Sequence, residues 1–310
     1  SLWLREAGVE RAAVTYFSWA ALGYSFKFVW APLVDLLPLP FLTRFFGRRR
    51  AWLLLSQLMI ISAICLMAMI DPAVDNLALM GLAAVLLGFS SATQDIVIDA
   101  YRIESAETEL QALMASTYVA GYRIGMLIAG AGALFLADYF GTTAENYNYS
   151  SWKSAYLLIA STMMIGVLTT LIISEPARQS NHKHSYRQQD YLKFLMLFIF
   201  AVLGFVASFY YSADLAQSLK AYLTSLFVNA NLAGFIVELA RLLLAVAVGA
   251  FIAKAVITSG MIQQKMVERA YLDPVKDFFT RFGWSLAWLL LALIGLYRVS
   301  DIVLGVISNV

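Results

Sequence analysis

The stretch LALMGLAAVLLGFSSATQDIVIDAYR, residues 77–102, decides the fold of this chain. Residues 77–92 carry no charge, and a helix needs about 20 mostly apolar residues to cross a bilayer, so this stretch begins a crossing. Asp95 and Asp99 are one helical turn apart, so both carboxylates and the adjoining Gln94 project to roughly one side. Carboxylates near a bilayer are costly and usually face a protein interior or a water-filled path. We therefore expect this segment to mark the functional region.

The composition indicates a membrane environment. Hydrophobic residues make up 61% of the chain, charged residues only 14%, and the mean hydropathy is +0.73. The fold class predicted from these values is all-α, a polytopic helical membrane protein. The net charge of +2 gives no strongly basic surface for a nucleic-acid partner.

Cysteine and histidine usage argues against a metal site or a cofactor. The single Cys65 excludes an intrachain disulfide and a cysteine-cluster metal site. His182 and His184 lie in a polar loop far from other ligand types, so a solvated loop is the expected reading. We expect neither a metal nor a cofactor.

Segment length and hydropathy predict eight crossings. Their approximate ranges are 13–34, 51–70, 77–99, 113–137, 153–173, 191–212, 232–257 and 282–308. Aromatic residues at the ends of these crossings are predicted to anchor the helices at the membrane interface, among them Trp52, Trp152, Tyr156 and Trp284.

The positive residues predict the orientation. Arginine and lysine concentrate in the connections 35–50, 174–190 and 258–281, which places these connections on the cytoplasmic side and residues 1–12 outside. The chain starts without methionine and stops in an apolar segment. We therefore expect a fragment that is incomplete at both ends, lacking one preceding crossing and a C-terminal part.

Several motifs, in their order and spacing, resemble one family. They are FKFVWAPLVD (26–35), GRRRAW (47–52), ATQDIVIDAYR (92–102), GYRIGMLIAGAGALFLAD (121–138) and YRVSDIVLGV (297–306). Together they resemble the AmpG-like muropeptide permease family of the major facilitator superfamily.

That resemblance implies an architecture with two six-helix halves around a central cavity, and two additional helices between the halves. Residues 1–176 would be the N-terminal half without its first crossing, 177–281 the loop and inserted helices, and 282–310 the first helix of the C-terminal half. The family imports anhydromuropeptides, which are GlcNAc-anhydroMurNAc peptides, into the cytoplasm with protons for peptidoglycan recycling. The expected partners are this substrate, protons and the lipid bilayer, for a monomer in the bacterial inner membrane.

The expected proton and transport path contains Asp95, Asp99, Gln94 and Arg123. Asp95 lies deeper in its crossing, whereas Asp99 with Arg102 also fits an ion pair at the cytoplasmic border. Gln94 suits either a substrate contact or a hydrogen bond between helices. Arg123 is about ten residues into its crossing, where it could bind a substrate carboxylate or pair with Asp95.

A gating loop is expected where Asp35 precedes Gly47, Arg48, Arg49 and Arg50. In the resembled superfamily the acid and the basic cluster pair across the cytoplasmic face. Eleven residues separate Asp35 from Gly47 here, more than in the compact form of this loop, so direct pairing stays open. Orientation alone is the alternative role of the arginines.

Four further residues are expected to contact substrate. Lys27 lies in an otherwise apolar crossing and could also extend to the cytoplasmic side. Tyr122 adjoins Arg123, while Arg298 and Asp301 are three residues apart and can pair with each other. Glu238 and Arg241 share that spacing and are predicted to be structural.

Other functions remain as alternatives. An acetyl-CoA carrier would need a more basic cavity for the phosphates of its substrate. Another major facilitator solute carrier is a further alternative. An intramembrane enzyme would need a nucleophile with a base, or metal ligands, within the crossings. No histidine lies inside a predicted crossing and Asp95 and Asp99 share one helix, so we predict a transporter rather than an enzyme. A receptor without transport is the remaining alternative.

Overall fold

The computed structural model describes residues 2–10, 17, 22–143, 146–176, 186–227 and 229–307, and every regular element within these ranges is a helix. Contacts divide the chain into two compact units, Ser1–Ser185 and Tyr186–Val310, which are described separately.

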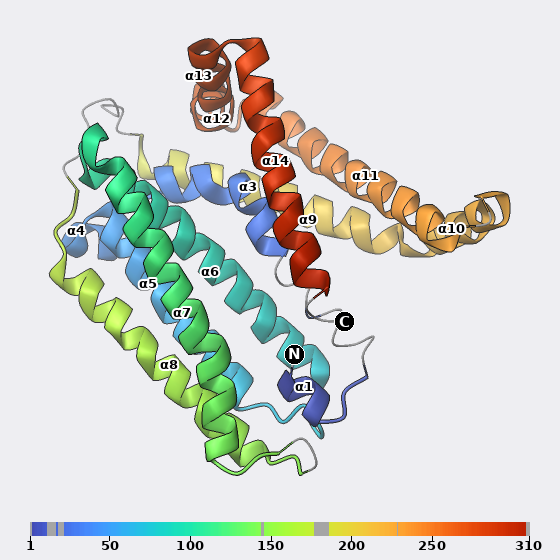
Figure 1. Cartoon of the computed structure of the whole chain (residues 1–310). Coiled ribbons are helices and arrows are strands. Elements are labelled where there is room, and N and C mark those ends of the chain that lie inside the picture. The colour runs from blue at the N-terminus through green and yellow to red at the C-terminus, as the bar shows by residue number, and fades with distance from the viewer. Residues whose placement is uncertain are drawn as a thin grey trace. The chain divides into compact units, whose positions relative to one another are not determined.

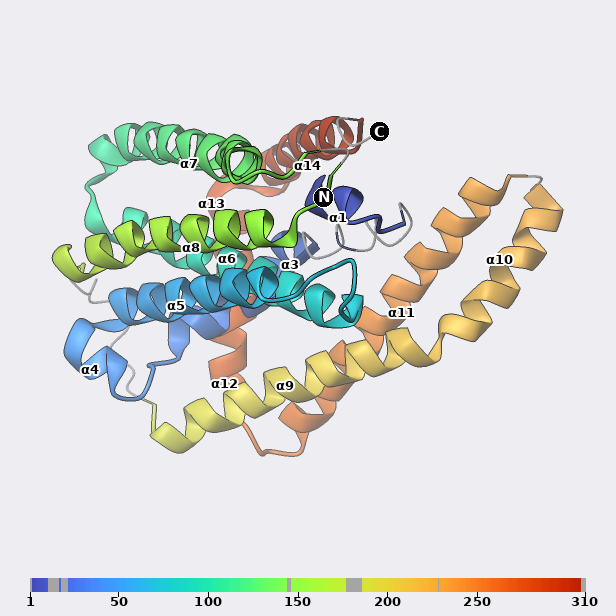
Figure 2. The same cartoon turned by 90° about the horizontal axis from the view of Figure 1, so that it is seen from below.

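The first unit is a helical bundle (Figure 1). In it α5 packs along both α6 and α8, α3 packs along α6, and α7 packs along α8. Helices α5 to α8 run nearly side by side in both views (Figure 2). Its elements are α1 (Leu2–Glu6), α3 (Leu22–Leu36), α4 (Leu42–Phe46), α5 (Arg48–Ala68), α6 (Leu77–Ser105), the short 3₁₀ turn η2 (Thr108–Leu110), α7 (Gln111–Tyr139) and α8 (Tyr149–Ile172).

Asparagine side chains fix where two of the long helices begin. Asn76 precedes α6 and accepts a hydrogen bond from the backbone N–H of Ala78 at 2.9 Å. Asn148 does the same for α8 through Ser150 at 3.0 Å. Each cap satisfies a backbone donor that the first helical turn leaves unpaired, so both helices start at a defined residue.

The short helix α1 is held by aromatic and polar contacts at one end of the bundle. Trp3 stacks on Trp152 with ring centroids 5.8 Å apart, and its indole N–H donates to the Tyr147 hydroxyl at 3.2 Å. Tyr147 in turn donates to Asp71 at 2.7 Å, and Trp152 donates to Glu6 at 2.8 Å. Burial and the hydrogen bond to the Asp71 carboxylate raise the pKa of Tyr147, which therefore stays a neutral donor.

Two predicted interface anchors are instead buried in the bundle. Trp152 is only 2% exposed, and Trp52 is buried with its indole N–H donating to the Leu37 carbonyl at 2.9 Å. The prediction was wrong for these two residues because the rotation of a helix, rather than the distance of a residue from its end, decides which side chains face inward. Trp284 is 69% exposed, as an anchor requires.

The second unit begins with a pair of long helices, α9 and α11, joined through α10 (Figure 2). A Cβ atom added to Gly249 would lie 3.1 Å from the Ala201 carbonyl oxygen, so glycine permits the two backbones to approach closely. Arg241 of α11 donates to the Phe209 carbonyl at 2.5 Å and bonds Glu238 at 3.3 Å. The elements are α9 (Gln188–Tyr211), α10 (Ala213–Phe227), α11 (Ala230–Thr258), α12 (Gln264–Val267), the π-helical segment η4 (Glu268–Leu272), α13 (Asp273–Phe282) and α14 (Trp284–Ile307).

Among the residues that the structure describes, six helices are long and apolar enough to cross a membrane, and they coincide with six of the eight predicted crossings. They are Arg48–Ala68, Leu77–Ser105, Thr108–Tyr139, Tyr149–Ile172, Gln188–Tyr211 and Leu232–Thr258. For the first predicted crossing, α3 supplies 15 residues and most of the remainder lies outside the described residues. The last is α14, which counts as a seventh crossing only together with the sharply bent segment before it.

Candidate functional site

Asp95 lies at the centre of a polar cluster that joins three helices of the first unit. Its Oδ2 accepts a hydrogen bond from the Lys27 ammonium of α3 at 2.5 Å. Its Oδ1 accepts a hydrogen bond from the Tyr118 hydroxyl of α7. The Asp95 side chain is 18% exposed and that of Lys27 33%, so the pair is largely removed from solvent. Both carboxylate oxygens of Asp95 are therefore engaged, each from a different neighbouring helix.

Asp99 and Arg102 extend this group, which we call the Asp95 cluster: Lys27, Asp95, Asp99, Arg102 and Tyr118. Asp99 lies 3.8 Å from the Lys27 ammonium and 3.3 Å from the Arg102 guanidinium. The guanidinium also stands over the Tyr118 ring, 5.6 Å from its centroid. The cluster thus holds two cationic and two anionic groups and has no net charge.

Packing between α3 and α6 sets the position of Lys27. The Trp30 indole N–H donates to the Thr93 hydroxyl at 3.2 Å, and the Trp30 ring lies 5.0 Å from that of Phe89. Lys27 precedes Trp30 by three residues and so lies on the same side of α3. The contacts of Trp30 therefore hold the ammonium against the turn of α6 that carries Asp95 and Asp99.

The structure differs from the sequence prediction in the partner it gives Asp95. Lys27, rather than Arg123, approaches the carboxylate, and Arg123 lies among the exposed residues of α7. Tyr122 is likewise exposed, and Gln94 is half-buried with no side-chain hydrogen bond to another described residue. The side chains of Arg298 and Asp301 lie outside the described ones.

A cavity of about 350 Å³ adjoins the same face of α6. Ser91 lies in its wall one helical turn before Asp95, and Tyr24 of α3 lies across from it. Trp3, Phe17 and Tyr156 add aromatic surface to the wall. The cavity therefore offers mainly apolar and aromatic walls with a few hydroxyl groups, next to the charged cluster.

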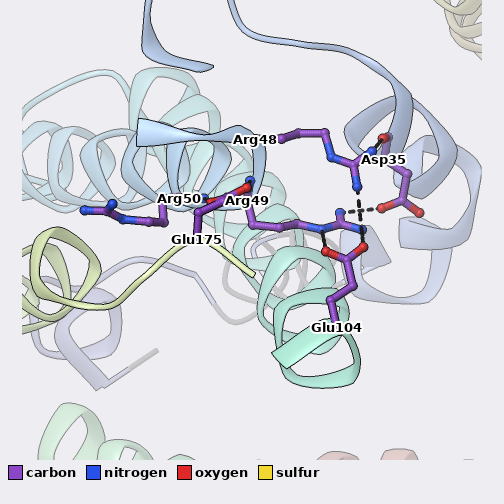
Figure 3. A network of polar contacts seen from close by, with 6 residues as sticks. All are labelled: Asp35, Arg48, Arg49, Arg50, Glu104 and Glu175. Atoms are coloured by element: carbon purple, nitrogen blue, oxygen red, sulfur yellow. Dashed lines mark hydrogen bonds and ion pairs between the residues drawn. The ribbon is translucent and has the colours of Figure 1, made fainter. Parts of the chain in front are cut away.

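A second polar group connects the ends of α3, α5, α6 and α8 (Figure 3). We call it the Arg49 network: Asp35, Arg48, Arg49, Arg50, Glu104 and Glu175. Arg49 is 4% exposed and makes a two-point contact with Glu104, from Nε at 2.9 Å and from Nη2 at 2.5 Å. Its remaining terminal nitrogen donates to Asp35 at 2.5 Å. The planar guanidinium suits this arrangement, because its donors form a fixed fork that matches a carboxylate.

The long loop therefore does not prevent direct pairing of Asp35 with the arginine cluster. Residues 37–47 contain the short helix α4 and return the chain to the end of α3. Arg48 adds a hydrogen bond to the Asp35 carbonyl at 2.5 Å and an ion pair with Glu104 at 3.4 Å. Asp35 and the arginine cluster are therefore in direct contact despite the length of the loop.

Glu175 and Arg50 form reciprocal caps between α5 and α8. The Glu175 carboxylate accepts hydrogen bonds from the backbone N–H groups of Arg49 at 2.8 Å and Arg50 at 3.1 Å, at the start of α5. Arg50 donates to the carbonyl oxygens of Thr170 at 2.9 Å and Leu171 at 2.7 Å, near the end of α8. Each charge thus meets the helix end whose dipole it complements.

Gly47 is required where the caps meet. Its φ of +84° and ψ of 174° place it in a region that is essentially restricted to glycine. A Cβ atom there would lie 2.4 Å from Cδ of Glu175, so the carboxylate occupies the space that a larger residue would need.

Sequence reasoning missed Tyr118, Glu104 and Glu175. Tyr118 carries no charge, and its hydroxyl becomes significant only because α7 turns it toward Asp95. The two glutamates stand at the ends of crossings opposite a concentration of arginines, and matching charges at helix ends is the signal that could have found them.

Within the described residues no group of three or more histidine, cysteine, aspartate or glutamate side chains could hold a metal ion. The contacts described at the two sites are ion pairs and hydrogen bonds.

Comparison with known proteins identifies the family to which this architecture belongs. The Major Facilitator Superfamily model matches residues 11–308. A Rickettsia felis protein named "Putative transporter AmpG 4" is 37% identical over 204 residues, which are 66% of this chain and 45% of that protein. The anhydromuropeptide permease of Escherichia coli K12 is 36% identical over 174 residues, 56% of this chain and 33% of the permease.

These matches bear directly on the fold and on the class of function. The chain covers less than half of the length of each of these relatives. The family match nevertheless extends over nearly the whole chain, and its members are transporters rather than enzymes. The chain belongs to the Major Facilitator Superfamily of membrane transporters and is related to the AmpG anhydromuropeptide permeases.

Proposed function

We propose that this chain forms part of a secondary transporter that imports anhydromuropeptides into the bacterial cytoplasm together with protons. The observation that carries the proposal is Asp95, whose two carboxylate oxygens are held by Lys27 and Tyr118 between three helices. The relationship to an anhydromuropeptide permease supports the substrate class.

The charge balance of the Asp95 cluster gives a route to coupling. With Asp95 ionised, the two cationic and two anionic groups cancel. A proton on Asp95 removes one negative charge and releases the Lys27 ammonium from its closest partner. The cluster then carries one positive charge, which favours binding of a substrate carboxylate such as those of a muropeptide stem peptide. Proton and substrate therefore bind together, as symport requires.

The neighbouring cavity suits the rest of such a substrate. Its aromatic walls can cover the apolar faces of sugar rings, and the hydroxyl groups of Tyr24 and Ser91 can bond sugar hydroxyls. An acetyl-CoA-type substrate carries several phosphate charges, whereas the cluster with a proton on Asp95 offers only one net positive charge.

The Arg49 network serves as the gate in this proposal, on the cytoplasmic side of an inner-membrane protein. Its ion pairs would close that side in one conformation and separate in the other. Residues 1–176 then belong to the N-terminal half, 177–281 contain the inserted helices α9 and α11, and 282–310 begin the C-terminal half. The proposed unit of function is a monomer.

The test is uptake of labelled anhydromuropeptide into proteoliposomes that contain the full-length protein. An inward proton gradient is expected to drive accumulation, and a protonophore to abolish it. Asp95→Asn is expected to lose gradient-driven accumulation but to retain exchange of external for internal substrate, because a neutral side chain no longer releases and rebinds a proton.

Asp277→Asn is the matched control, because Asp277 is an exposed carboxylate on α13 and should leave accumulation unchanged. Accumulation that survives the protonophore would refute proton coupling. Normal accumulation by Asp95→Asn would instead remove Asp95 from the proton path while leaving the substrate assignment intact. Absence of any muropeptide transport would overturn the proposed substrate.

A further inference from the structure

Helix α13 (Asp273–Phe282) has two chemically distinct faces. Its apolar residues recur at spacings of three and four and fall on one side of the helix: Val275, Phe278, Phe279 and Phe282. The other side carries Asp273, Lys276, Asp277, Thr280 and Arg281. Asp277 and Arg281 form an exposed ion pair at 2.8 Å on this polar side. Val275 is 55% exposed and Phe282 41%, whereas Phe278 and Phe279 are half-buried, so the described residues cover the apolar face only in part.

This helix is too short and too charged to cross a membrane by itself. Ten residues of α-helix span about 15 Å, which is half of the hydrocarbon thickness. Four of its ten residues are charged, in the sequence DPVKDFFTRF. The following helix, α14, starts WSLAWLLLALIGL and has the apolar composition of a crossing.

The chain turns sharply between the two helices. The axis of Gln264–Phe282 makes an angle of 111° with that of Trp284–Leu296, close to perpendicular (Figure 1). Gly283 makes the turn with a φ of +71°, a conformation that glycine adopts without strain. If α14 crosses the bilayer, α13 must run nearly parallel to the membrane plane.

Contacts between aromatic rings show which face of α13 is turned toward α14. Phe279 lies 4.7 Å from the ring of Trp284 and 5.6 Å from that of Trp288, measured between centroids. Because Trp288 is more than one turn into α14, the apolar face of α13 faces the direction in which α14 enters the membrane. The apolar surface of α13 is thereby continuous with the exposed tryptophans of α14, which is the composition of a membrane-interface belt.

We propose that α13 lies in the membrane interface, with its apolar face bound to lipid at the boundary between headgroups and acyl chains. Val275, Phe278 and Phe282 enter this boundary, while Lys276, Asp277 and Arg281 stay among headgroups and water. Two acidic and two basic residues balance within α13, so burial of the aromatic face holds the helix in place. The attachment therefore does not depend on anionic lipid, and it fixes the depth at which α14 begins.

Site-specific labelling of the full-length protein tests this placement. In a background from which Cys65 and any other native cysteine have been replaced with serine, single cysteines at Val275 and Asp277 would carry an environment-sensitive fluorophore, in nanodiscs of zwitterionic phosphatidylcholine. A nitroxide on the lipid chain near the headgroup is expected to quench the label at position 275 several-fold more than the label at 277. Aqueous iodide is expected to show the opposite order.

A second pair, Phe282→Cys and Lys276→Cys, repeats the comparison at independent positions. Equal quenching of the two faces would overturn the proposal, and so would an apolar face protected from both quenchers, since a protein surface would then cover it. Replacing part of the lipid with anionic phosphatidylglycerol, with or without high salt, is expected to leave the pattern unchanged. Lipid quenching that appears only with anionic lipid and disappears in salt would mean that charge holds the helix, contrary to the proposal.

Discussion

The Arg49 network and the Asp95 cluster both tie α6 to its neighbours through charged groups, but they are built in different ways. Arg49 is almost fully buried and divides three strong hydrogen bonds between two carboxylates. Lys27 makes one close contact, with Asp95, and has a second carboxylate, Asp99, at 3.8 Å. The first arrangement fixes one geometry through several bonds, whereas the second leaves a flexible ammonium with an alternative partner nearby.

This difference suggests distinct roles within one helical bundle. The Arg49 network joins the helix ends through several bonds, so the helices separate there only when several bonds break together. A pair that depends on one contact can exchange partners when a single proton arrives. Substitutions in the Arg49 network should therefore change the free energy of unfolding most, whereas substitutions in the Asp95 cluster should abolish proton coupling with little change in that free energy.

The largest effect on stability is expected at Arg49. Arg49→Met leaves Glu104 and Asp35 without their principal partner and should lower the free energy of unfolding by about 3 kcal/mol, with the partial exposure of both acids keeping the loss from being larger. Arg49→Lys retains the charge but not the two-point contact with Glu104, so it should lose about half as much. Thermal unfolding of the detergent-solubilised protein, followed by tryptophan fluorescence, measures both. Equal stability of Arg49→Lys and the unsubstituted protein would show that fork geometry is unimportant here.

A smaller loss is expected for Gly47→Ala. The glycine-specific backbone conformation and the 2.4 Å approach of the new Cβ atom to Glu175 should together cost about 2 kcal/mol of unfolding free energy. The control is Gly81→Ala in α6, where nothing lies within 4 Å of an added Cβ atom. That substitution should be neutral or stabilise by up to about 1 kcal/mol, since alanine favours the helix. Equal melting temperatures for the two variants would contradict the role of Gly47.

The smallest stability change is expected for the charge-neutral double substitution Lys27→Met with Asp95→Asn. Removing both partners leaves no unpaired charge, and the pair is partly exposed, so the free energy of unfolding should stay within about 1 kcal/mol of the original. Gradient-driven uptake should nevertheless be lost. A double variant as unstable as Arg49→Met would mean that the Asp95 cluster is a structural tie of the same kind as the Arg49 network.

Much of the architecture follows from the sequence because hydropathy and length are local properties. Six of the predicted crossings have bounds within six residues of those of helices that are long and apolar enough to cross a membrane. The perpendicular turn at Gly283 was not predicted, because the polar side of α13 made residues 258–281 resemble an ordinary loop. In DPVKDFFTRF the apolar residues recur at spacings of three and four, which is the pattern of an amphipathic helix. Recognising this pattern would have predicted α13.

The residues of the site were predicted in part, but most of their contacts were not. Asp95, Lys27, Asp35 and Arg49 stand out because charged residues are rare in apolar segments. Which of them meet depends on helix rotation and on the path of the chain between helices, neither of which is local. Lys27 therefore replaced Arg123 as the neighbour of Asp95.

The reciprocal caps of Arg50 and Glu175 have a mechanical consequence. Sliding α5 along α8 would break two bonds to carbonyl oxygens and two bonds to backbone N–H groups at the same moment. We therefore expect α5 and α8 to move together as one rigid body during transport. In α3, by contrast, the interior Pro32 cannot donate a backbone hydrogen bond, so the backbone hydrogen bonding of that helix is interrupted between Lys27 and its C-terminal end. The paired helices α5 and α8 and the proline-containing helix α3 therefore differ in how firmly their backbones are tied.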